Sequence, residues 1–197
     1  MKKNKKGKII LISGPSGVGK KTIWTPIINK PKFNLVFSVS MTTRKKRKGE
    51  VNGKDYFFVT KRQFEEAIAS HELLEYATFT DNYYGTPKKF VDNVRSKGKN
   101  IFLEIEPKGG LQIIDICKKN KDNNILTIFI VPPSLKELKK RLTKRGTESK
   151  DVIEQRIEQA KWEIKQQKYY QYVIVNKPGK PEEATKQLFD ILSDKLK

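Results

Sequence analysis

The chain has 197 residues, enough for one α/β domain with a sizeable core and small inserted lobes. Its single cysteine and single histidine exclude an internal disulfide, a cysteine–histidine zinc site and most catalytic schemes that pair a nucleophile with a histidine base. The formal charge of +20 favours anionic ligands, although lysine is spread along the whole chain and is not clustered with aromatic residues as in RNA-binding proteins.

The first predicted element is a strand at Lys8–Ile12, which leads into a glycine-rich loop and then a segment compatible with a helix. The loop reads Gly14-Pro15-Ser16-Gly17-Val18-Gly19-Lys20-Lys21-Thr22. Its glycines let backbone N–H groups converge on phosphate oxygens, the following helix offers its positive dipole end, and Lys20 can reach the phosphates. The strict P-loop pattern places Ser or Thr directly after the lysine, whereas here Lys21 intervenes before Thr22. The loop predicts binding of a nucleoside triphosphate.

The elements that follow the loop alternate between strand and helix. Further strands are expected at Leu35–Val39, Ile101–Ile105, Ile125–Val131 and Tyr172–Val175, and helices after the loop and at Gly110–Lys118, Leu135–Lys144, Asp151–Tyr169 and Glu182–Leu196. The strands are continuous apolar runs, as in parallel strands covered on both faces. This alternation predicts a doubly wound α/β fold with a parallel five-stranded sheet and ligands at the carboxyl ends of its strands. Pro26 should kink or shorten the helix after the loop.

Residues 41–87 break the alternation, with strand-like stretches at Tyr56–Val59 and Leu74–Phe79 around a short helix at Phe64–Ala69. We interpret this segment as an inserted mixed α/β lobe.

The lobe carries side chains that suit a phosphorylated guanine nucleoside. Arg44 and Arg47, with two tyrosine hydroxyls, can clamp a phosphate monoester, because guanidinium groups match its oxygens. A lone carboxylate such as Glu75 can accept from two donors on one base edge, and guanine presents N1–H and N2–H₂ side by side. Considered separately, these stretches are unremarkable, since residues 44–48 also fit a solvated basic loop and residues 83–85 a turn.

Several stretches, in chain order, together resemble the guanylate kinase family. They are the loop at 14–22, then 37–44, 49–56 and 82–86, and later Pro132-Pro133-Ser134, Arg141-Leu142, Arg145-Gly146-Thr147 and Val175-Asn176. The resemblance covers essentially the whole chain. It implies a P-loop core at 1–40 and 88–197, a helical lid at about 134–160 and a GMP-binding lobe at 41–87. It also implies transfer of a phosphoryl group from ATP to GMP and dGMP, in purine nucleotide metabolism, with Mg²⁺ as cofactor.

The resemblance also implies a role for individual residues of this chain. The residues implied to bind ATP are Gly14, Pro15, Ser16, Gly17, Val18, Gly19, Lys20, Lys21, Thr22 and Asn176. Those implied to bind GMP are Ser40, Arg44, Arg47, Tyr56, Glu75, Tyr84, Thr86 and Glu104. Catalytic charge would come from Lys20, Arg44, Arg141, Arg145 and Arg156, and Thr22 and Glu106 would hold the metal, through water. The chain departs from the family pattern at Lys21, Glu106, Lys108 and Lys177.

Two alternatives belong to other functional classes. Guanylate-kinase-like domains also occur as catalytically weak binding modules, which typically lose the P-loop glycines and lysine that this chain retains. A basic nucleic-acid-binding protein is the other alternative, on charge alone. With no apolar run that approaches a membrane span and no signal peptide, we expect a cytoplasmic monomer or homodimer. Its partners would be ATP and GMP, with no membrane and no dedicated nucleic acid.

Overall fold

A parallel sheet forms the centre of the molecule, for which the computed structural model describes residues 6–79, 81–145 and 149–196. The sheet order is β2-β7-β1-β8-β9 and every neighbouring pair is parallel. Its strands are β1 (Ile9–Ser13), β2 (Leu35–Phe37), β7 (Asn100–Glu104), β8 (Ile125–Val131) and β9 (Tyr172–Val175). The predicted five-stranded parallel sheet is confirmed.

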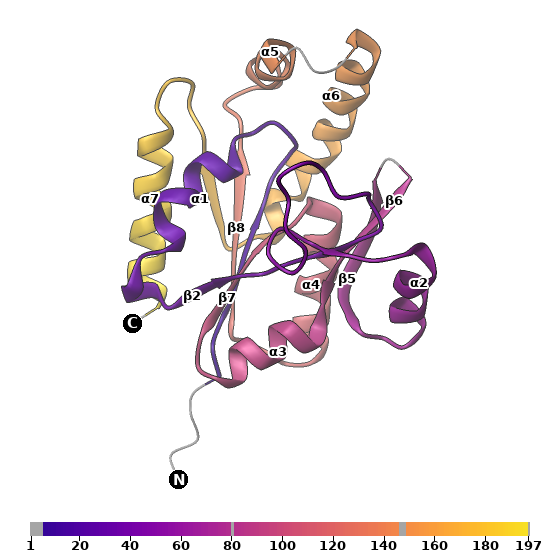
Figure 1. The fold of residues 1–197 in the computed structure, drawn as a ribbon. Helices are drawn as coiled ribbons and strands as arrows, with labels where there is room; N and C mark the ends of the chain where they lie inside the picture. Colours follow the sequence, from indigo (N-terminus) through magenta and orange to yellow (C-terminus); the bar gives the residue numbers. More distant parts are fainter. Residues whose placement is uncertain (1–5, 80, 146–148, 197) are drawn as a thin grey trace.

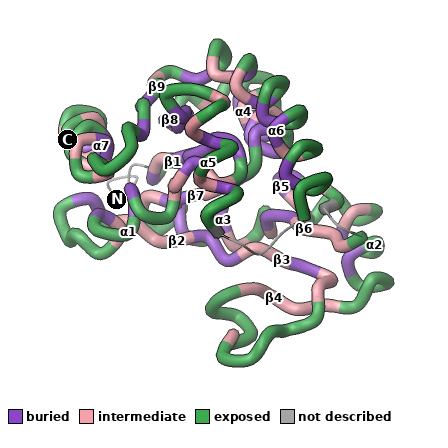
Figure 2. The backbone as a smooth tube through the Cα atoms, turned by 90° about the horizontal axis from the view of Figure 1, so that it is seen from above, coloured by how far each residue is buried: buried purple, intermediate pink, exposed green. Residues whose placement is uncertain are grey.

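Helices cover both faces of this sheet. Helices α1 (Lys20–Ile28) and α7 (Pro181–Lys195) lie on one side, and α3 (Lys88–Ser96) and α4 (Pro107–Lys119) on the other (Figure 1). Ile10 and Ile12 of β1 belong to the first buried cluster, whereas Ile9 and Leu11 belong to the second. Because successive side chains of a strand point to opposite faces, a strand buried on both faces must be apolar throughout. This explains the continuous apolar runs (Figure 2).

Two helices, in the segment predicted to form a lid, rise beyond the carboxyl ends of the strands (Figure 1). Helix α5 (Leu135–Arg145) packs on α6 (Lys150–Lys165) through a small core of their own, formed by Leu138, Leu142, Ile153, Ile157 and Ala160. In Figure 1 the pair stands above the edge of the sheet that carries the glycine-rich loop. No helix in the described ranges is long and apolar enough to cross a membrane.

A second sheet builds the inserted lobe beside the core. Its order is β4-β3-β6-β5, from β3 (Met41–Thr42), β4 (Phe57–Phe58), β5 (Leu73–Phe79) and β6 (Asn82–Pro87). Helix α2 (Lys61–Ala69) begins with a capping box between Thr60 and Gln63, and its buried Phe64 stacks on Tyr83 at 5.1 Å between ring centroids. The loop that precedes β4 is exposed along most of its length (Figure 2).

Several expected boundaries are corrected by the structure. Strand β2 ends at Phe37 instead of Val39, and α4 begins at Pro107 instead of Gly110. The helix expected at Asp151–Tyr169 is α6 followed by a 3₁₀ turn at Gln166–Tyr169. Helix α1 continues past Pro26 but ends two residues later, which agrees with the expected shortening.

Two strands and one α-helix have no counterpart among the predicted elements. They are β3, β6 and α3. Residues 83–85 form strand instead of turn because β6 pairs with β3 on one side and β5 on the other. A 3₁₀ turn, η1 (Pro31–Phe33), precedes β2.

Candidate active site

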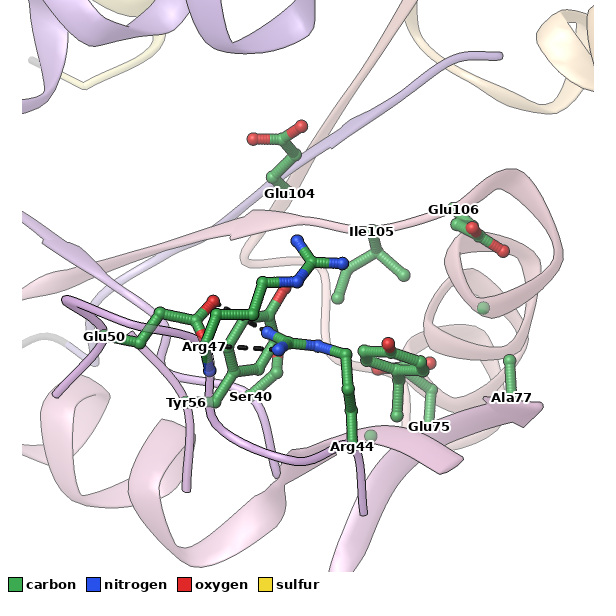
Figure 3. A pocket seen from close by; sticks show the side chains of 13 residues that line it. Ser40, Arg44, Arg47, Glu50, Tyr56, Glu75, Ala77, Glu104, Ile105 and Glu106 are labelled. Carbon is green, nitrogen blue, oxygen red and sulfur yellow. Dashed lines mark hydrogen bonds and ion pairs between the residues drawn. The ribbon is translucent and has the colours of Figure 1, made fainter. Parts of the chain in front are cut away.

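Two neighbouring pockets open at the carboxyl ends of the parallel strands. The first, which we call the lobe pocket, has a volume of about 340 Å³. It is lined by Ser40, Arg44, Arg47, Glu50, Tyr56, Glu75, Ala77, Tyr84, Gly85, Glu104, Ile105, Glu106 and Gly109 (Figure 3). The second, which we call the P-loop pocket, has a volume of about 200 Å³. It is lined by Gly14, Ser16, Lys20, Glu104, Ile105, Glu106, Arg156, Gln159 and Glu163. Molecules in the two pockets would meet across the shared segment 104–106.

The glycine-rich loop joins the buried strand β1 to helix α1. Gly14, Gly17 and Gly19 have φ angles of 149°, 83° and 93°, a backbone region that side chains disfavour. A Cβ atom at Gly14 would also collide with the carbonyl oxygen of Ile130 on β8. Helix α1 begins at Lys20, so its first N–H groups and positive dipole end face the loop. This geometry fits the phosphate site that the sequence predicts.

Lys20 folds back over the glycine-rich loop. Its Nζ donates to the carbonyl oxygens of Gly14, at 2.7 Å, and Pro15, at 3.3 Å. The ammonium group therefore lies across the mouth of the loop, within the P-loop pocket. A phosphate that enters the pocket would meet this charge together with the loop N–H groups.

Helix α6 closes the P-loop pocket with three polar side chains. Arg156, Gln159 and Glu163 have the spacing that places side chains on one helix face. Arg156 donates from Nη1 to Ser16 Oγ at 3.0 Å, and Gln159 donates from Nε2 to Glu163 Oε1 at 2.8 Å. Glu163 is buried, and this burial raises its pKa. Gln159 and Glu163 are site residues beyond those predicted from the sequence, and their spacing from Arg156 is the signal that could have indicated them.

Arg141 lies behind the glycine-rich loop and away from Arg156. Its guanidinium donates to the carbonyl oxygens of Val18, at 3.1 Å, and Asn176, at 2.9 Å, and its Nε donates to Glu137 at 3.0 Å. Asn176 Nδ2 donates to the same Val18 oxygen at 2.7 Å. The structure therefore brings Arg141 together with Asn176, in a pocket of about 400 Å³ behind the loop.

The predicted lid residue Arg145 and the predicted metal residues Thr22 and Glu106 belong to different parts of the molecule. Arg145 is the last residue of α5, and its side chain lies outside the described part of the chain. Lys21 is exposed, and Thr22 lines the pocket behind the loop. Glu106 instead lines both main pockets, so the structure does not bring Thr22 and Glu106 together.

Glu106, which follows β7, suits a metal ion that is held mainly by a substrate. No group of three or more His, Cys, Asp or Glu side chains that could hold a metal occurs in the described residues. Mg²⁺ usually keeps several waters and takes one or two carboxylates together with phosphate oxygens, so it needs no cage made only of protein ligands. The Glu106 carboxylate lines the P-loop pocket, and it fits this mode of binding.

Glu75 is a buried carboxylate in the lobe pocket. It is 6% exposed, and its Oε1 accepts a hydrogen bond from Thr86 Oγ1 at 2.7 Å. Burial raises the pKa of Glu75 to about 7, against the opposing effect of the Thr86 hydrogen bond. Gly109 at the start of α4 lets the carboxylate lie close, because a Cβ there would collide with Glu75 Oε2. A carboxylate held out of water in this way favours a ligand that donates hydrogen bonds.

Arg44 is paired with a carboxylate of its own loop, between β3 and β4, where it lines the lobe pocket. Its Nη2 and Nη1 donate to the two carboxylate oxygens of Glu50, at 2.7 and 3.1 Å (Figure 3). The guanidinium carbon lies 5.3 Å from the ring centroid of Tyr56, and the rings of Tyr56 and Tyr84 are 6.1 Å apart. The Glu50 hydrogen bond raises the pKa of Arg44, and burial raises that of Tyr56. Arg47 projects into the pocket from the same loop (Figure 3).

Glu50 and Trp24 are further site residues that the sequence analysis did not assign. Glu50 lies six residues after Arg44, and it also accepts a hydrogen bond from the Arg47 backbone N–H at 2.8 Å. Trp24 Nε1 donates to Glu104 Oε2 at 2.6 Å. Residues 24 and 104 belong to separate elements and are 80 positions apart, so no local pattern links them.

The predicted residues of the lobe pocket do come together. Ser40, Tyr84 and Glu104 line it with the two arginines, and Thr86 lies behind Glu75. The pocket thus combines the buried carboxylate of Glu75 with the guanidinium groups of Arg44 and Arg47. These groups can hold a molecule that presents both hydrogen-bond donors and an anion, next to the phosphate-binding loop.

Comparisons with known proteins agree with this arrangement. A family model described as guanylate kinase matches residues 6–195. The chain is 49% identical over 194 residues to the guanylate kinase of Malacoplasma penetrans, covering 98% of this chain and 96% of the relative. It is 49% identical to that of Streptococcus thermophilus, covering 88% and 80%. The crystal structure of guanylate kinase from Anaplasma phagocytophilum aligns with a TM-score of 0.71 at 32% identity, covering 98% and 87%.

Proposed function

This chain belongs to the guanylate kinase family, and from that membership we propose that it transfers the γ-phosphoryl group of ATP to GMP, with dGMP as a second acceptor. The products are ADP and GDP or dGDP. The observation that carries the proposal is the segment Glu104–Glu106, which lines both pockets and brings an acceptor phosphate close to the donor phosphates. Two phosphates held in this way need only alignment and charge neutralisation to react.

In this proposal the lobe pocket binds GMP. Glu75 accepts from the N1–H and N2–H₂ of guanine, and Thr86 fixes the carboxylate through its 2.7 Å hydrogen bond. Arg44, Arg47, Tyr56 and Tyr84 hold the acceptor phosphate at the other end of the pocket. AMP would present an acceptor at N1 and leave the buried carboxylate unpaired, which supports selection of guanine.

The P-loop pocket and the lid bind ATP and stabilise the transferred group. The loop N–H groups and Lys20 hold the donor phosphates, and Arg156 neutralises charge from the lid side. Arg141 and Asn176 line the pocket behind the loop, and in this proposal the nucleoside of ATP binds on that side. Mg²⁺, held by the phosphates and by Glu106 through water, would neutralise charge on the donor phosphates. No general base is required, because the acceptor is already a phosphate oxygen.

The proposal is tested by measuring ADP formation with ATP, Mg²⁺ and each nucleoside monophosphate in turn. We expect turnover with GMP and dGMP and at most about a hundredth of that rate with AMP, CMP or UMP, because an unpaired buried carboxylate costs several kcal/mol. Comparable rates with AMP would contradict the assigned role of Glu75. No turnover with any monophosphate, from a folded protein, would contradict the enzymatic function.

Phosphoryl transfer in this assay would distinguish a kinase from a binding module and from a nucleic-acid-binding protein, and the contacts in the site also favour the kinase. A binding module has no need of the ammonium group that Lys20 places across the loop. The three loop glycines also have the φ angles that a phosphate-binding loop requires. A nucleic-acid-binding protein has no need of a buried carboxylate opposite two arginines. These contacts favour the kinase over both.

A further inference from the structure

Trp24 occupies a buried position between the phosphate loop and the sheet. It lies one helical turn after Lys20, so the two side chains share a face of α1. The indole is 8% exposed and stacks on Phe37 at 4.9 Å between centroids. It also contacts Phe102 of β7 at 5.5 Å. The same face of α1 therefore carries Lys20, the lysine predicted to bind phosphate, and the buried indole of Trp24.

The Trp24 N–H group points at a functional carboxylate. Nε1 donates to Glu104 Oε2 at 2.6 Å, a hydrogen bond between a neutral donor and a charged acceptor. Phe102 and Glu104 are two residues apart on β7 and point to the same face of the sheet, which lets one indole contact both. Glu104 also lines both pockets, where its carboxylate can meet a ligand.

Glu104 shares the lobe pocket with two arginines. It lines the pocket together with Arg44 and Arg47, and guanidinium groups attract carboxylates in general. In Figure 3 its carboxylate points away from the Arg44–Glu50 pair, and its Oε2 accepts the hydrogen bond from Trp24 Nε1. A carboxylate free to pair with Arg47 would occupy donors that the acceptor phosphate needs.

We propose that Trp24 is a positioning residue of the acceptor site, whose indole N–H holds Glu104 at the boundary of the two pockets and keeps Arg47 available to the acceptor phosphate. The inference rests on the proposed function. It predicts that loss of the N–H weakens binding of the acceptor and leaves donor binding and the transfer step nearly unchanged.

Kinetics of Trp24→Phe test this inference, because phenylalanine keeps an aromatic ring against Phe37 and Phe102 but removes the donor. We expect KM for GMP to rise about tenfold or more, with kcat and KM for ATP changed less than about twofold. The matched control is Trp162→Phe, which removes the other tryptophan, 46% exposed on α6, and should leave all three constants unchanged. A Trp24→Phe enzyme with wild-type KM for GMP would overturn the inference.

A double-mutant cycle with Glu104→Ala separates positioning from packing. If Trp24 acts through Glu104, adding Trp24→Phe to Glu104→Ala should change KM for GMP less than about twofold. Equal effects of Trp24→Phe in both backgrounds would mean that the indole matters only for packing, and would overturn the inference. A wild-type protein that forms no GDP would overturn the proposed function and the inference with it, which distinguishes the two failures.

Fluorescence gives a readout that does not depend on turnover or on folding of Trp24→Phe. In the Trp162→Phe protein, Trp24 is the remaining tryptophan. Saturating GMP should change its emission, because the ligand contacts the carboxylate bound to the indole, and Glu104→Ala should abolish this change. An emission that GMP does not alter, or a change that survives Glu104→Ala, would overturn the inference.

Discussion

The burial of Glu75 lowers the stability of the folded protein but prepares its carboxylate to accept hydrogen bonds from a ligand. The pKa of a glutamate is ordinarily near 4.5, and burial raises that of Glu75 to about 7. A raised carboxyl pKa means that the folded state holds the proton more tightly than the unfolded chain. The raised pKa therefore costs no folding stability below about pH 4.5, where the carboxyl group is protonated in both states, and the full penalty, on the order of 3 kcal/mol, applies above about pH 7. A ligand that donates two hydrogen bonds offsets this penalty.

The raised pKa of Glu75 predicts a pH-dependent KM for GMP. Below about pH 7 a growing fraction of the free enzyme carries protonated Glu75, which cannot accept from both guanine donors. KM for GMP should rise as the pH falls from about 7.5 to 5.5, approaching tenfold per pH unit. Glu75→Gln is the matched control, because it retains the titration of the GMP phosphate but not of the carboxyl group. Identical pH profiles for the two proteins would contradict the role of Glu75.

In the proposed reaction, Lys20 is the residue whose charge the transfer step needs most. Its contacts are with loop carbonyl groups and not with the apolar core, so Lys20→Ala should leave the thermal unfolding midpoint nearly unchanged. We expect kcat to fall by about a hundredfold or more. Lys119→Ala, which removes an exposed lysine paired with Asp115, controls for net charge. A Lys20→Ala enzyme that keeps more than about a tenth of wild-type kcat would refute this assignment.

At the scale of elements, the two sides of the lobe differ, because strand β5 is hydrogen-bonded to helix α4 of the core and the loop between β3 and β4 is mostly exposed. Gln112 of α4 donates from Nε2 to the carbonyl oxygen of Tyr76 at 3.1 Å and accepts from its N–H at 3.4 Å. Gln112 thereby pairs with the edge strand β5, which carries Glu75. Arg44 and Arg47 lie in an exposed loop on the other side of the lobe, between β3 and β4. The guanine end of the pocket is therefore fixed, and the phosphate end is freer to move.

This asymmetry predicts where GMP changes hydrogen exchange. Amides in residues 44–58 should gain protection when GMP binds, because the acceptor phosphate draws their arginines towards the core. Amides in β5 should change little, because α4 already anchors that strand. AMP at the same concentration serves as the control ligand. A protection pattern that is uniform over the lobe, or unaffected by GMP, would contradict this view of closure.

The success of sequence-based prediction differed between elements for physical reasons. The core strands were predictable because burial on both faces requires continuous apolar runs, as in β8. Helix α3 was missed because its nine residues hold only Phe90, Val91 and Val94 as apolar positions, which is a weak periodic signal. Strand β6 was missed because its glycine and tyrosines read equally well as a turn until β3 and β5 pair with it.

The parts of the candidate site that could be predicted are those formed by residues close together in the sequence. The glycine-rich loop is one continuous stretch, and Arg44 and Arg47 are three residues apart, so their chemistry can be inferred from their spacing. The side chains that orient the site residues come from distant parts of the sequence and could not be predicted in this way. Trp24 contacts Glu104 across 80 positions, and Gln112 contacts Tyr76 across 36. Contacts of this kind follow from the fold and leave no local signal in a single sequence.

At the scale of the whole molecule, the chain contains 42 basic and 22 acidic residues and is therefore strongly positive. The two pockets nevertheless contain carboxylates, which are those of Glu75, Glu104, Glu106 and Glu163. In the proposed reaction, the positive field would attract nucleotides from a distance, whereas the buried carboxylates would select among them. Attraction over such distances is screened by salt, with a Debye length of about 10 Å at 0.1 M ionic strength.

The net charge therefore predicts a salt-dependent encounter with both substrates. Raising NaCl from about 50 to 500 mM should lower kcat/KM for ATP and for GMP severalfold while kcat changes little. Sucrose at matched viscosity controls for slower diffusion. A kcat/KM value that is independent of salt would mean that the +20 charge has no part in substrate capture.

The central claim is that a phosphoryl group passes directly from ATP in the P-loop pocket to GMP in the lobe pocket. Anion-exchange chromatography of a reaction of the purified protein with ATP, Mg²⁺ and GMP, together with a colorimetric assay for free phosphate, tests it most directly, because ADP and GDP elute as separate peaks. The account predicts that GDP and ADP appear in equal amounts, that free phosphate stays near background, and that no ADP forms when GMP is omitted. ADP and free phosphate accumulating without GDP would contradict it.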